Sequence, residues 1–593
     1  MNIPERLEKL RAEMKKRAIA AYIVPSDDFH ASEYVGAHFK AREFFSGFTG
    51  SAGTLVVLEK SAGLWTDGRY FLQASQQLKG SGIELMKMEE PDVPTIEKYL
   101  ADTLPDGAVV GFDGRTVSCS FADKLMKAAG EKGITLYGKE DLADLVWTDR
   151  PALSAEKVWR MDEAVCEPRR EKLERVRGKL AEKKCEVLLL SGLEETAWLL
   201  NLRGNDVEST PVFLSYMIIT PDKALLFANS EIFSADILYE LEADGVKLMP
   251  YGEIENALTE ESRGKRVWAD KESTNYRLMD CLGDAKSIEK ERNPVILMKA
   301  VKSEEEQNGM RWAHIKDGVA CVKFTHWLKK NVGREKITEL SASEKLLSFR
   351  AEQDGFIEKS FESIVGYGAH GAIIHYAPNE ATDCVVEPRG LLLVDSGGHY
   401  LDGTTDITRT IVVGELTEEE KHAFTLVLKG HLRLSAAKFK YGVGGGTLDY
   451  LAREPLWAEG LDYNHGTGHG VGFVLSVHEG PQRIHSKGEN IVVTMEPGMI
   501  TSDEPGLYIE GKFGIRHENL LLCVENEKTD FGRFLSFENL TMVPYDLDGI
   551  DVSLLTGEER KLLNGYHRTV RETISPYLSG EEKAWLEDAT REV

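Results

Sequence analysis

An internal repeat is the feature that most constrains the fold of this 593-residue chain. Residues 6–26 and 172–192 share one plan: an amphipathic helix, a short polar break and a buried apolar strand. The apolar positions of the two segments correspond in order, with Leu7, Leu10 and Met14 matching Leu173, Val176 and Leu180. The sequence therefore predicts two similar α/β domains.

The sequence pattern changes after a junction near residue 302. Helical segments with apolar faces are followed by strand-rich sequence from Phe361 onward, and the tail from Pro544 returns to charged helical sequence. A chain of this length is too long for one hydrophobic core. We therefore expect α/β domains over residues 1–155 and 156–302, and an α+β domain over residues 303–593 with a helical extension from about residue 544.

The charge and the N-terminus exclude several classes of function. A net charge of −26 disfavours nucleic-acid binding, because phosphates need a basic face. The chain contains no run of about 18 apolar residues that would predict a membrane span. Residues 1–17 lack the apolar stretch of a secretory signal, so we expect a cytoplasmic protein. Seven scattered cysteines without a CxxC pair indicate neither a disulfide framework nor a thiolate zinc site.

Two aspartates interrupt strand-like sequence. Asp395 closes the apolar run LLLVD, and Asp406 opens the strand candidate DITRTIVV that follows a turn-rich segment. If these strands pair antiparallel, their period of two directs both carboxylates to one face. A buried carboxylate needs an arginine partner, a proton or a metal ion, because desolvating an unpaired charge is costly. Taken singly, an aspartate in such a position is more often a turn or cap residue.

Two glutamates and a histidine extend this pattern. Glu496 in VVTMEPGM and Glu518 in GIRHENLLL each interrupt an apolar strand candidate, and His469 lies in the glycine-rich HGTGHGVGF. Four carboxylates and one imidazole form a set rich in hard oxygen ligands, which suits manganese, cobalt or zinc. Two cations sharing one water would provide a bridging hydroxide at neutral pH and would polarise a scissile carbonyl. We therefore predict two divalent metal ions, with manganese preferred, held by Asp395, Asp406, His469, Glu496 and Glu518.

Further histidines in the same region are candidates for binding substrate or stabilising an oxyanion. They are His375 in AIIHY, His465 in the glycine-rich loop and His478 in VHEGP. Sequence context leaves catalytic and structural roles equally open for these three. We expect structural or surface roles for the others in this region, as for most single histidines: His370, His399, His431 and His485.

The ordered motifs resemble those of the pita-bread metallopeptidases. They are VDSG with Asp395, TTDITRT with Asp406, HGTGHGVG with His469, VHEGP with His478, MEPGM with Glu496 and RHEN with Glu518. Within that family the chain resembles the long, three-domain form of aminopeptidase P. The segments SGFTGSAGTLVV, LWTDGRYFLQA, VWTDRP and AWLLNLRGNDVESTPVF are similar to its two creatinase-like domains, so the resemblance covers nearly the whole chain.

This resemblance implies an enzyme that releases the N-terminal residue from peptides with proline in second position. Asp395 and Asp406 would bind one metal, His469 and Glu496 would bind the other, and Asp406 and Glu518 would bridge the two. Glu496 would carry the proton from water to the leaving nitrogen. The supporting residues implied by the resemblance are His375 and His478 for substrate and oxyanion, His465 for the proline side, and Arg516 beside Glu518. A homodimer is also implied.

One residue departs from the family pattern. His517 stands between Arg516 and Glu518, where the resemblance predicts an apolar side chain. If strand alternation holds, His517 faces away from the metal ligands and only local packing is affected.

Three alternatives compete with an aminopeptidase. A prolidase, which cleaves Xaa-Pro dipeptides, shares the ligands but resembles a shorter chain without the repeat. Creatinase has the same fold without metal and would not need all five ligands. A catalytically inactive peptidase-like binding module would have lost ligands, and the sequence retains all five.

Overall fold

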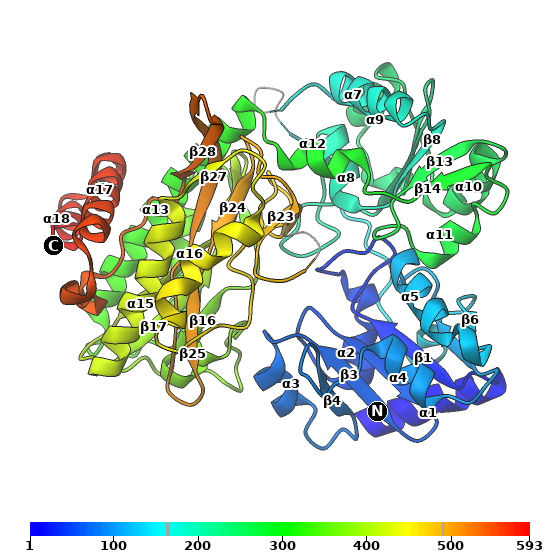
Figure 1. The fold of residues 1–593 in the computed structure, drawn as a ribbon, viewed down its shortest axis with the longest axis horizontal. Coiled ribbons are helices and arrows are strands. Elements are labelled where there is room, and N and C mark those ends of the chain that lie inside the picture. Colours follow the sequence, from blue (N-terminus) through cyan, green and yellow to red (C-terminus); the bar gives the residue numbers. More distant parts are fainter. Residues whose placement is uncertain (162–165, 489–491) are drawn as a thin grey trace. The chain divides into compact units, whose positions relative to one another are not determined.

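The computed structural model describes residues 1–161, 166–488 and 492–593, and its chain separates into two compact units (Figure 1). Residues 1–161 and 167–296 form the first unit, and residues 297–593 with Cys166 form the second. Among the described residues, none of the helices has the length and apolar character that crossing a membrane requires.

The first unit contains two six-stranded mixed sheets with the same strand order. In each sheet the strand that follows the first helix of the domain, β1 or β8, pairs antiparallel with one neighbour and parallel with the other. Both edge strands are parallel to their neighbours. The predicted duplication is therefore confirmed. The first sheet runs β4 (Glu84–Lys87), β3 (Ala62–Thr66), β2 (Thr54–Leu58), β1 (Ala21–Pro25), β5 (Val109–Phe112) and β6 (Thr135–Tyr137). The second runs β12 (Val246–Pro250), β11 (Ala224–Ala228), β10 (Ser215–Ile219), β8 (Val187–Leu190), β13 (Arg266–Ala269) and β14 (Ser287–Glu289).

The helices that precede the two central strands use the apolar positions expected from the repeat. In α1 (Ile3–Lys16) the buried residues are Leu7, Leu10 and Met14, and α7 (Arg169–Glu182) buries Leu173, Val176 and Leu180. Strand β1 is covered on both faces, because Tyr22 and Val24 pack with α1 while Ala21 and Ile23 pack with α4 (Ile96–Thr103) and α5 (Cys119–Ala129). Burial on both faces explains why these strands are almost entirely apolar.

The second unit is an α+β fold built from several small sheets and one larger antiparallel sheet. The order of the six-stranded sheet is β21 (Lys438–Lys440), β28 (Gly532–Asn539), β27 (Asn519–Thr529), β24 (Ile500–Asp503), β22 (Gly468–Gly470) and β23 (Glu479–Ile484). One smaller sheet contains β15 (Phe356–Lys359), β18 (Gly398–Tyr400) and β19 (Gly403–Thr404). A second contains β16 (Ile364–Tyr367), β17 (Leu391–Ser396) and β20 (Ile407–Val412). A third pairs β25 (Gly506–Ile509) with β26 (Phe513–Arg516).

The antiparallel pairing of β17 with β20 fixes the faces of the two predicted aspartates. Asp395 pairs with Thr408, so Asp406, two residues before Thr408, lies on the same face as Asp395. Leu392 and Val394 point to the other face, where they pack beneath α13 (Glu304–Asn331) and α14 (Glu339–Ala351). One side of this small sheet therefore packs beneath these two helices, and the other side carries the carboxylates at its Asp395 end.

The remaining helices of this unit support the sheets from outside. Thr417 and Glu420 form a capping box at the start of α15 (Glu418–Ser435). The helical tail is also present, as α17 (Gly557–Ile574) and α18 (Gly580–Ala589), and buries Val570 and Leu586 against α13. Helix α16 (Gly445–Trp457) packs against α15 and β23.

Candidate metal centre

Asp395 lies at the end of β17 with one oxygen paired and the other not. Its Oδ2 atom accepts a 2.5 Å hydrogen bond from Nη2 of Arg516. Its Oδ1 atom is buried, and among the described residues it has no hydrogen-bond partner. A buried carboxylate oxygen without a donor is unfavourable unless a cation approaches it. Asp395 therefore has one oxygen held by protein and one available to a metal ion.

His469 approaches the carboxylates from the neighbouring sheet. Its backbone N–H donates to Oγ of Ser502 (2.9 Å), which fixes β22 against β24. The Nε2 atom of the ring lies 3.5 Å from Oδ2 of Asp406 and 3.4 Å from Oε1 of Glu504. One imidazole nitrogen is thus shared between two carboxylates that come from different strands.

Glu518 completes the group on the other side. Its backbone N–H donates to the carbonyl of Thr408 (3.1 Å), and its Oε2 atom accepts from Oγ1 of Thr408 (2.7 Å). Ligand atoms of Asp406, His469 and Glu518 all lie within 4.8 Å of one another, close enough to share metal ions. The structure therefore brings Asp395, Asp406, His469 and Glu518 together.

Glu496 does not join this cluster. Residues 492–499, expected to be a strand, form no strand, and Glu496 instead accepts a 2.7 Å hydrogen bond from the hydroxyl of Tyr441. Glu504 occupies the expected position, directly after β24 and beside His469. We therefore replace Glu496 by Glu504 as the candidate ligand.

The misassignment of Glu496 has a clear origin in the sequence. The tripeptide Glu-Pro-Gly occurs twice, at 496–498 and at 504–506. The first copy follows the apolar VVTM, which is typical of a strand, whereas the second follows the polar ITSD. The real strand is ITSD, buried at all four positions inside the larger sheet, so hydrophobicity pointed to the wrong copy.

Burial and neighbouring negative charges raise the pKa values of three of these carboxyl groups. Burial and the charge of Asp395 raise the pKa of Asp406 to about 8. Burial is the main cause that raises the pKa of Glu518 well above its ordinary value, and the charges of Asp406, Asp395 and Glu504 add to the rise. Burial also raises the pKa of Glu504. Because Asp406, Glu504 and Glu518 resist ionisation in this buried group, the group suits divalent cations, which offset its charge.

Arg516 joins the cluster to a predicted substrate residue. Its guanidinium is fully buried, and besides Asp395 it donates to the hydroxyl of Tyr508 (2.7 Å). The same hydroxyl lies 2.8 Å from Nε2 of His465. Sequence analysis missed Tyr508, which lies in the short strand β25. A chain of contacts therefore runs from His465 through Tyr508 and Arg516 to Asp395.

The other two predicted substrate histidines lie in separate loops. The ring of His478 is 4.4 Å from that of His469, measured between centroids, and its charge counteracts the rise in the pKa of Asp406. The next residue, Glu479, is buried and is held by the ammonium groups of Lys299 and Lys302. His375 is half-buried and follows Ile374, whose carbonyl accepts from Nη2 of Arg516 (3.4 Å).

The remaining histidines have other surroundings. His399 is buried, with its Nδ1 atom 2.9 Å from the hydroxyl of Thr404. His431 is buried against the hydroxyl of Tyr545, 2.6 Å from its Nε2 atom. The ring of His517 packs against Phe424, with centroids 4.4 Å apart. As expected from strand alternation, His517 occupies a packing environment on the side of α15.

Comparisons with known proteins place the chain in a family. The model of metallopeptidase family M24 matches residues 308–525, and that of the C-terminal region of this peptidase family matches residues 533–593. Two models of the creatinase/prolidase N-terminal domain match residues 6–144 and 149–306.

Individual relatives match along almost the whole chain. A probable Xaa-Pro aminopeptidase P of Botryotinia fuckeliana is 41% identical, with 99% of this chain and 92% of that protein covered. One from Fusarium vanettenii is also 41% identical, with 99% and 98% covered. The crystal structure of X-prolyl aminopeptidase from Caenorhabditis elegans, described as a cytosolic enzyme with a di-nuclear active site, is 35% identical, with a TM-score of 0.96 and both chains fully covered.

The fold, the carboxylate cluster and these matches define a metallopeptidase with two creatinase-like N-terminal domains and a pita-bread catalytic domain. The chain belongs to metallopeptidase family M24 and, within it, to the Xaa-Pro aminopeptidase P group.

The raised carboxyl pKa values predict how pH affects the metal-free chain. A group whose pKa rises on folding, as that of Asp406 rises from 3.8 to about 8, stabilises the fold at low pH and loses this contribution as pH rises through about 8. The buried histidines His314, His431 and His567 have pKa values that are lowered on folding, so they make the fold more stable as pH rises towards ~6.5. Above pH ~6.5 their contribution is constant and no longer offsets the loss from the carboxyl groups. Urea unfolding in chelator should therefore show lower stability at pH ~8 than at pH ~6.5.

The Asp406→Asn variant serves as the control for this measurement, because it removes the titrating carboxyl. Its stability should fall less over the same pH interval, and adding manganese should reduce the fall in the wild-type chain. A metal-free wild-type chain that is equally stable or more stable at pH ~8 would contradict the description of the cluster.

Proposed function

We propose that this chain is an Xaa-Pro aminopeptidase that hydrolyses the first peptide bond of substrates with proline in second position, using two divalent metal ions. The observation that carries the proposal is the convergence of four carboxylates and one imidazole at one buried point. The relatives named above, which carry the same activity in their names, support it.

The residues of the cluster divide into two ligand groups. Asp395 and Asp406 would hold one metal ion, His469 and Glu504 would hold the other, and Asp406 and Glu518 would bridge them. The buried Oδ1 atom of Asp395 and the mutual repulsion of the carboxylates support this division. Bound metal ions would supply a nucleophilic water at neutral pH and polarise the scissile carbonyl. Manganese is our preferred metal, because the ligand set is rich in hard oxygen atoms.

Glu504 is the proposed proton carrier, in place of Glu496. A carboxylate beside the metal-bound water could accept a proton from it and pass that proton on. The leaving nitrogen of an Xaa-Pro bond carries no hydrogen and must gain one before proline can depart as an amine. Glu504, adjacent to His469 at the edge of the cluster, is therefore assigned the transfer of this proton.

The surrounding histidines would select and orient the substrate. His478, in ring contact with His469, would donate to the oxyanion, and His375 would hold the substrate backbone. His465, with Tyr508, would line the side that receives proline. Arg516 would keep one oxygen of Asp395 occupied and thereby fix the direction of the other oxygen.

Several finer features complete the proposal. We infer domains at residues 1–155, 156–302 and 303–593, a homodimer, and a cytoplasmic location, the last supported by the cytosolic description of the Caenorhabditis elegans enzyme.

Prolidase activity is less well supported, because the Xaa-Pro dipeptidase of Bacillus anthracis covers only 64% of this chain and, at 23% identity, shares the fold alone. An inactive module is also disfavoured, since the cluster contains five potential ligands.

Substrate selectivity tests the function directly. The purified chain supplied with manganese should remove the first residue of Arg-Pro-Pro and leave Arg-Ala-Pro largely intact, because a proline-side pocket recognises the ring. Release of arginine can be followed by liquid chromatography. Equal cleavage of both peptides, or cleavage that is independent of metal, would refute the assignment.

The two Glu-Pro-Gly copies provide a matched pair of variants for the ligand assignment. Glu504→Gln should lower kcat about 10³-fold, because it removes both a metal ligand and the proton carrier. Glu496→Gln makes the same chemical change in the same tripeptide and should leave activity close to that of wild type. Comparable losses in the two variants, or loss in Glu496→Gln alone, would return the assignment to Glu496.

A further inference from the structure

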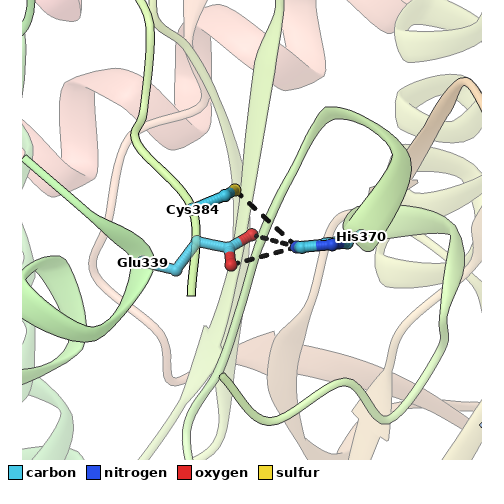
Figure 2. A group of neighbouring side chains, drawn as sticks. All are labelled: Glu339, His370 and Cys384. Carbon is cyan, nitrogen blue, oxygen red and sulfur yellow. Dashed lines mark hydrogen bonds and ion pairs between the residues drawn. The ribbon is translucent and has the colours of Figure 1, made fainter. Parts of the chain in front are cut away.

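A second group of potential ligands lies outside the carboxylate cluster. Glu339 is the first residue of α14, His370 belongs to the short helix η6 (Gly368–Ala372), and Cys384 lies in the segment that follows. Figure 2 shows that these three side chains, from three separate segments, point toward one another. None of them belongs to the proposed dinuclear centre.

The distances within this group are short enough for shared coordination. Nδ1 of His370 lies 2.9 Å and 3.0 Å from the two carboxylate oxygens of Glu339. Sγ of Cys384 lies 3.7 Å from the same nitrogen. One ligand atom from each residue falls within 4.8 Å of the others, so a single ion could contact all three.

The backbone around the group is held in place by hydrogen bonds. The backbone N–H of Glu339 donates to the carbonyl of Cys384 (3.1 Å), and that of Leu340 donates to Oδ1 of Asp383 (3.0 Å). The start of α14 is thereby fixed to the segment that carries the thiol. Two of the three ligands are thus preorganised relative to each other.

The carboxylate of Glu339 is oriented by further donors. It accepts from the backbone N–H of Tyr367 (2.7 Å) and from the hydroxyl of Tyr376 (2.8 Å). The ring of His370 packs at a tilt against that of Tyr376, with centroids 4.6 Å apart. Such outer contacts, which orient ligands in known metal sites, leave the Nδ1 atom of His370 directed at Glu339 and Cys384.

Exposure and charge also suit an ion. The side chain of Glu339 is fully buried, whereas that of His370 is 31% exposed, so an ion can enter from solvent at the histidine. A thiolate and a carboxylate together carry two negative charges, which balance one divalent cation. The site would therefore be electrically neutral when filled.

The chemistry of the three ligands selects a different metal from the one proposed above. Thiolate and imidazole ligands favour zinc, whereas an oxygen-rich site suits manganese. We propose that Glu339, His370 and Cys384 form a zinc site, with a solvent molecule as the fourth ligand. Zinc would join the start of α14 to η6 and to the segment around Cys384.

Binding would release protons in a defined way. The hydrogen bond that His370 donates to Glu339 raises the pKa of His370, and burial with the charge of Glu339 raises the pKa of the Cys384 thiol to about 12. Zinc therefore displaces the proton of the thiol, which goes to solvent as the Zn–S bond forms. A protonated His370 likewise loses its Nδ1 proton to solvent, whereas in neutral His370 the hydrogen moves to Nε2 as the Zn–N bond forms. Affinity should rise with pH.

The site is separate from the dinuclear centre although both adjoin the same small sheet. Tyr367, whose N–H binds Glu339, pairs with Leu392 at one end of β17, and Asp395 lies three residues further along. That separation along a strand is roughly 10 Å. A metal ion at one position therefore does not occupy the other.

Cobalt distinguishes the two sites by spectroscopy. The full-length chain, stripped of metal and then supplied with two equivalents of Mn²⁺, is titrated with Co²⁺. Cobalt bound to a thiolate gives a sulfur-to-metal charge-transfer band in the near ultraviolet, and the carboxylate cluster contains no cysteine. We expect the wild-type chain to develop this band with the final intensity of one thiolate-bound cobalt per chain, whereas cobalt that replaces manganese in the carboxylate cluster does not contribute to the band.

Two variants and a control complete the test. Cys384→Ser should abolish the band, and His370→Asn should weaken cobalt binding about 10-fold or more. Cys281→Ser, another partly buried free thiol, should leave the band unchanged. Manganese-dependent peptidase activity serves as the check that each variant is folded. A wild-type chain without the band, or a band that survives in Cys384→Ser, would overturn the proposal.

Discussion

Mutual repulsion among buried carboxylates is the constraint on which the catalytic unit depends. Asp395, Asp406, Glu504 and Glu518 come from four separate strand ends, and burial together with the charges of neighbouring carboxylates raises the pKa values of Asp406, Glu504 and Glu518. Hydrophobic packing alone would not keep four such groups together, because burying unpaired charge opposes folding. The strands β17, β20, β24 and β27 nevertheless bring them to one point, and metal ions provide the compensating charge. The cluster is thus both a source of instability in the metal-free fold and its proposed reactive centre.

A second level of structure directs these carboxylates. Arg516 holds one oxygen of Asp395 and, through Tyr508, reaches His465, so a metal ligand and a proposed substrate residue share one buried support. Glu479, next to His478, is held by two buried lysines from the segment that begins the unit. These contacts determine the directions of side chains whose ring or carboxylate must face a substrate. A change in a supporting residue should therefore act on substrate placement as well as on stability.

Much of this arrangement could be predicted from the sequence, and the exceptions have physical reasons. The repeat predicted the two α/β halves because its helices bury one face, with Leu7 and Leu173 at equivalent positions. The positions of Asp395 and Asp406 on one face followed from strand alternation. Glu504 was missed because its strand, ITSD, is polar although buried, so a hydrophobicity pattern favoured the copy at Glu496. The group of Glu339, His370 and Cys384 could not be predicted either, since tertiary contacts alone bring these residues together.

The central claim is that two metal ions lie among Asp395, Asp406, His469, Glu504 and Glu518. Anomalous diffraction at the manganese absorption edge, from crystals grown with manganese, tests it most directly because it locates the ions without assuming their ligands. The account predicts two peaks separated by roughly 3.5 to 4 Å, both within coordination distance of this set, with Asp406 and Glu518 between them. A peak beside Glu496, or the absence of manganese from the carboxylate cluster, would contradict it.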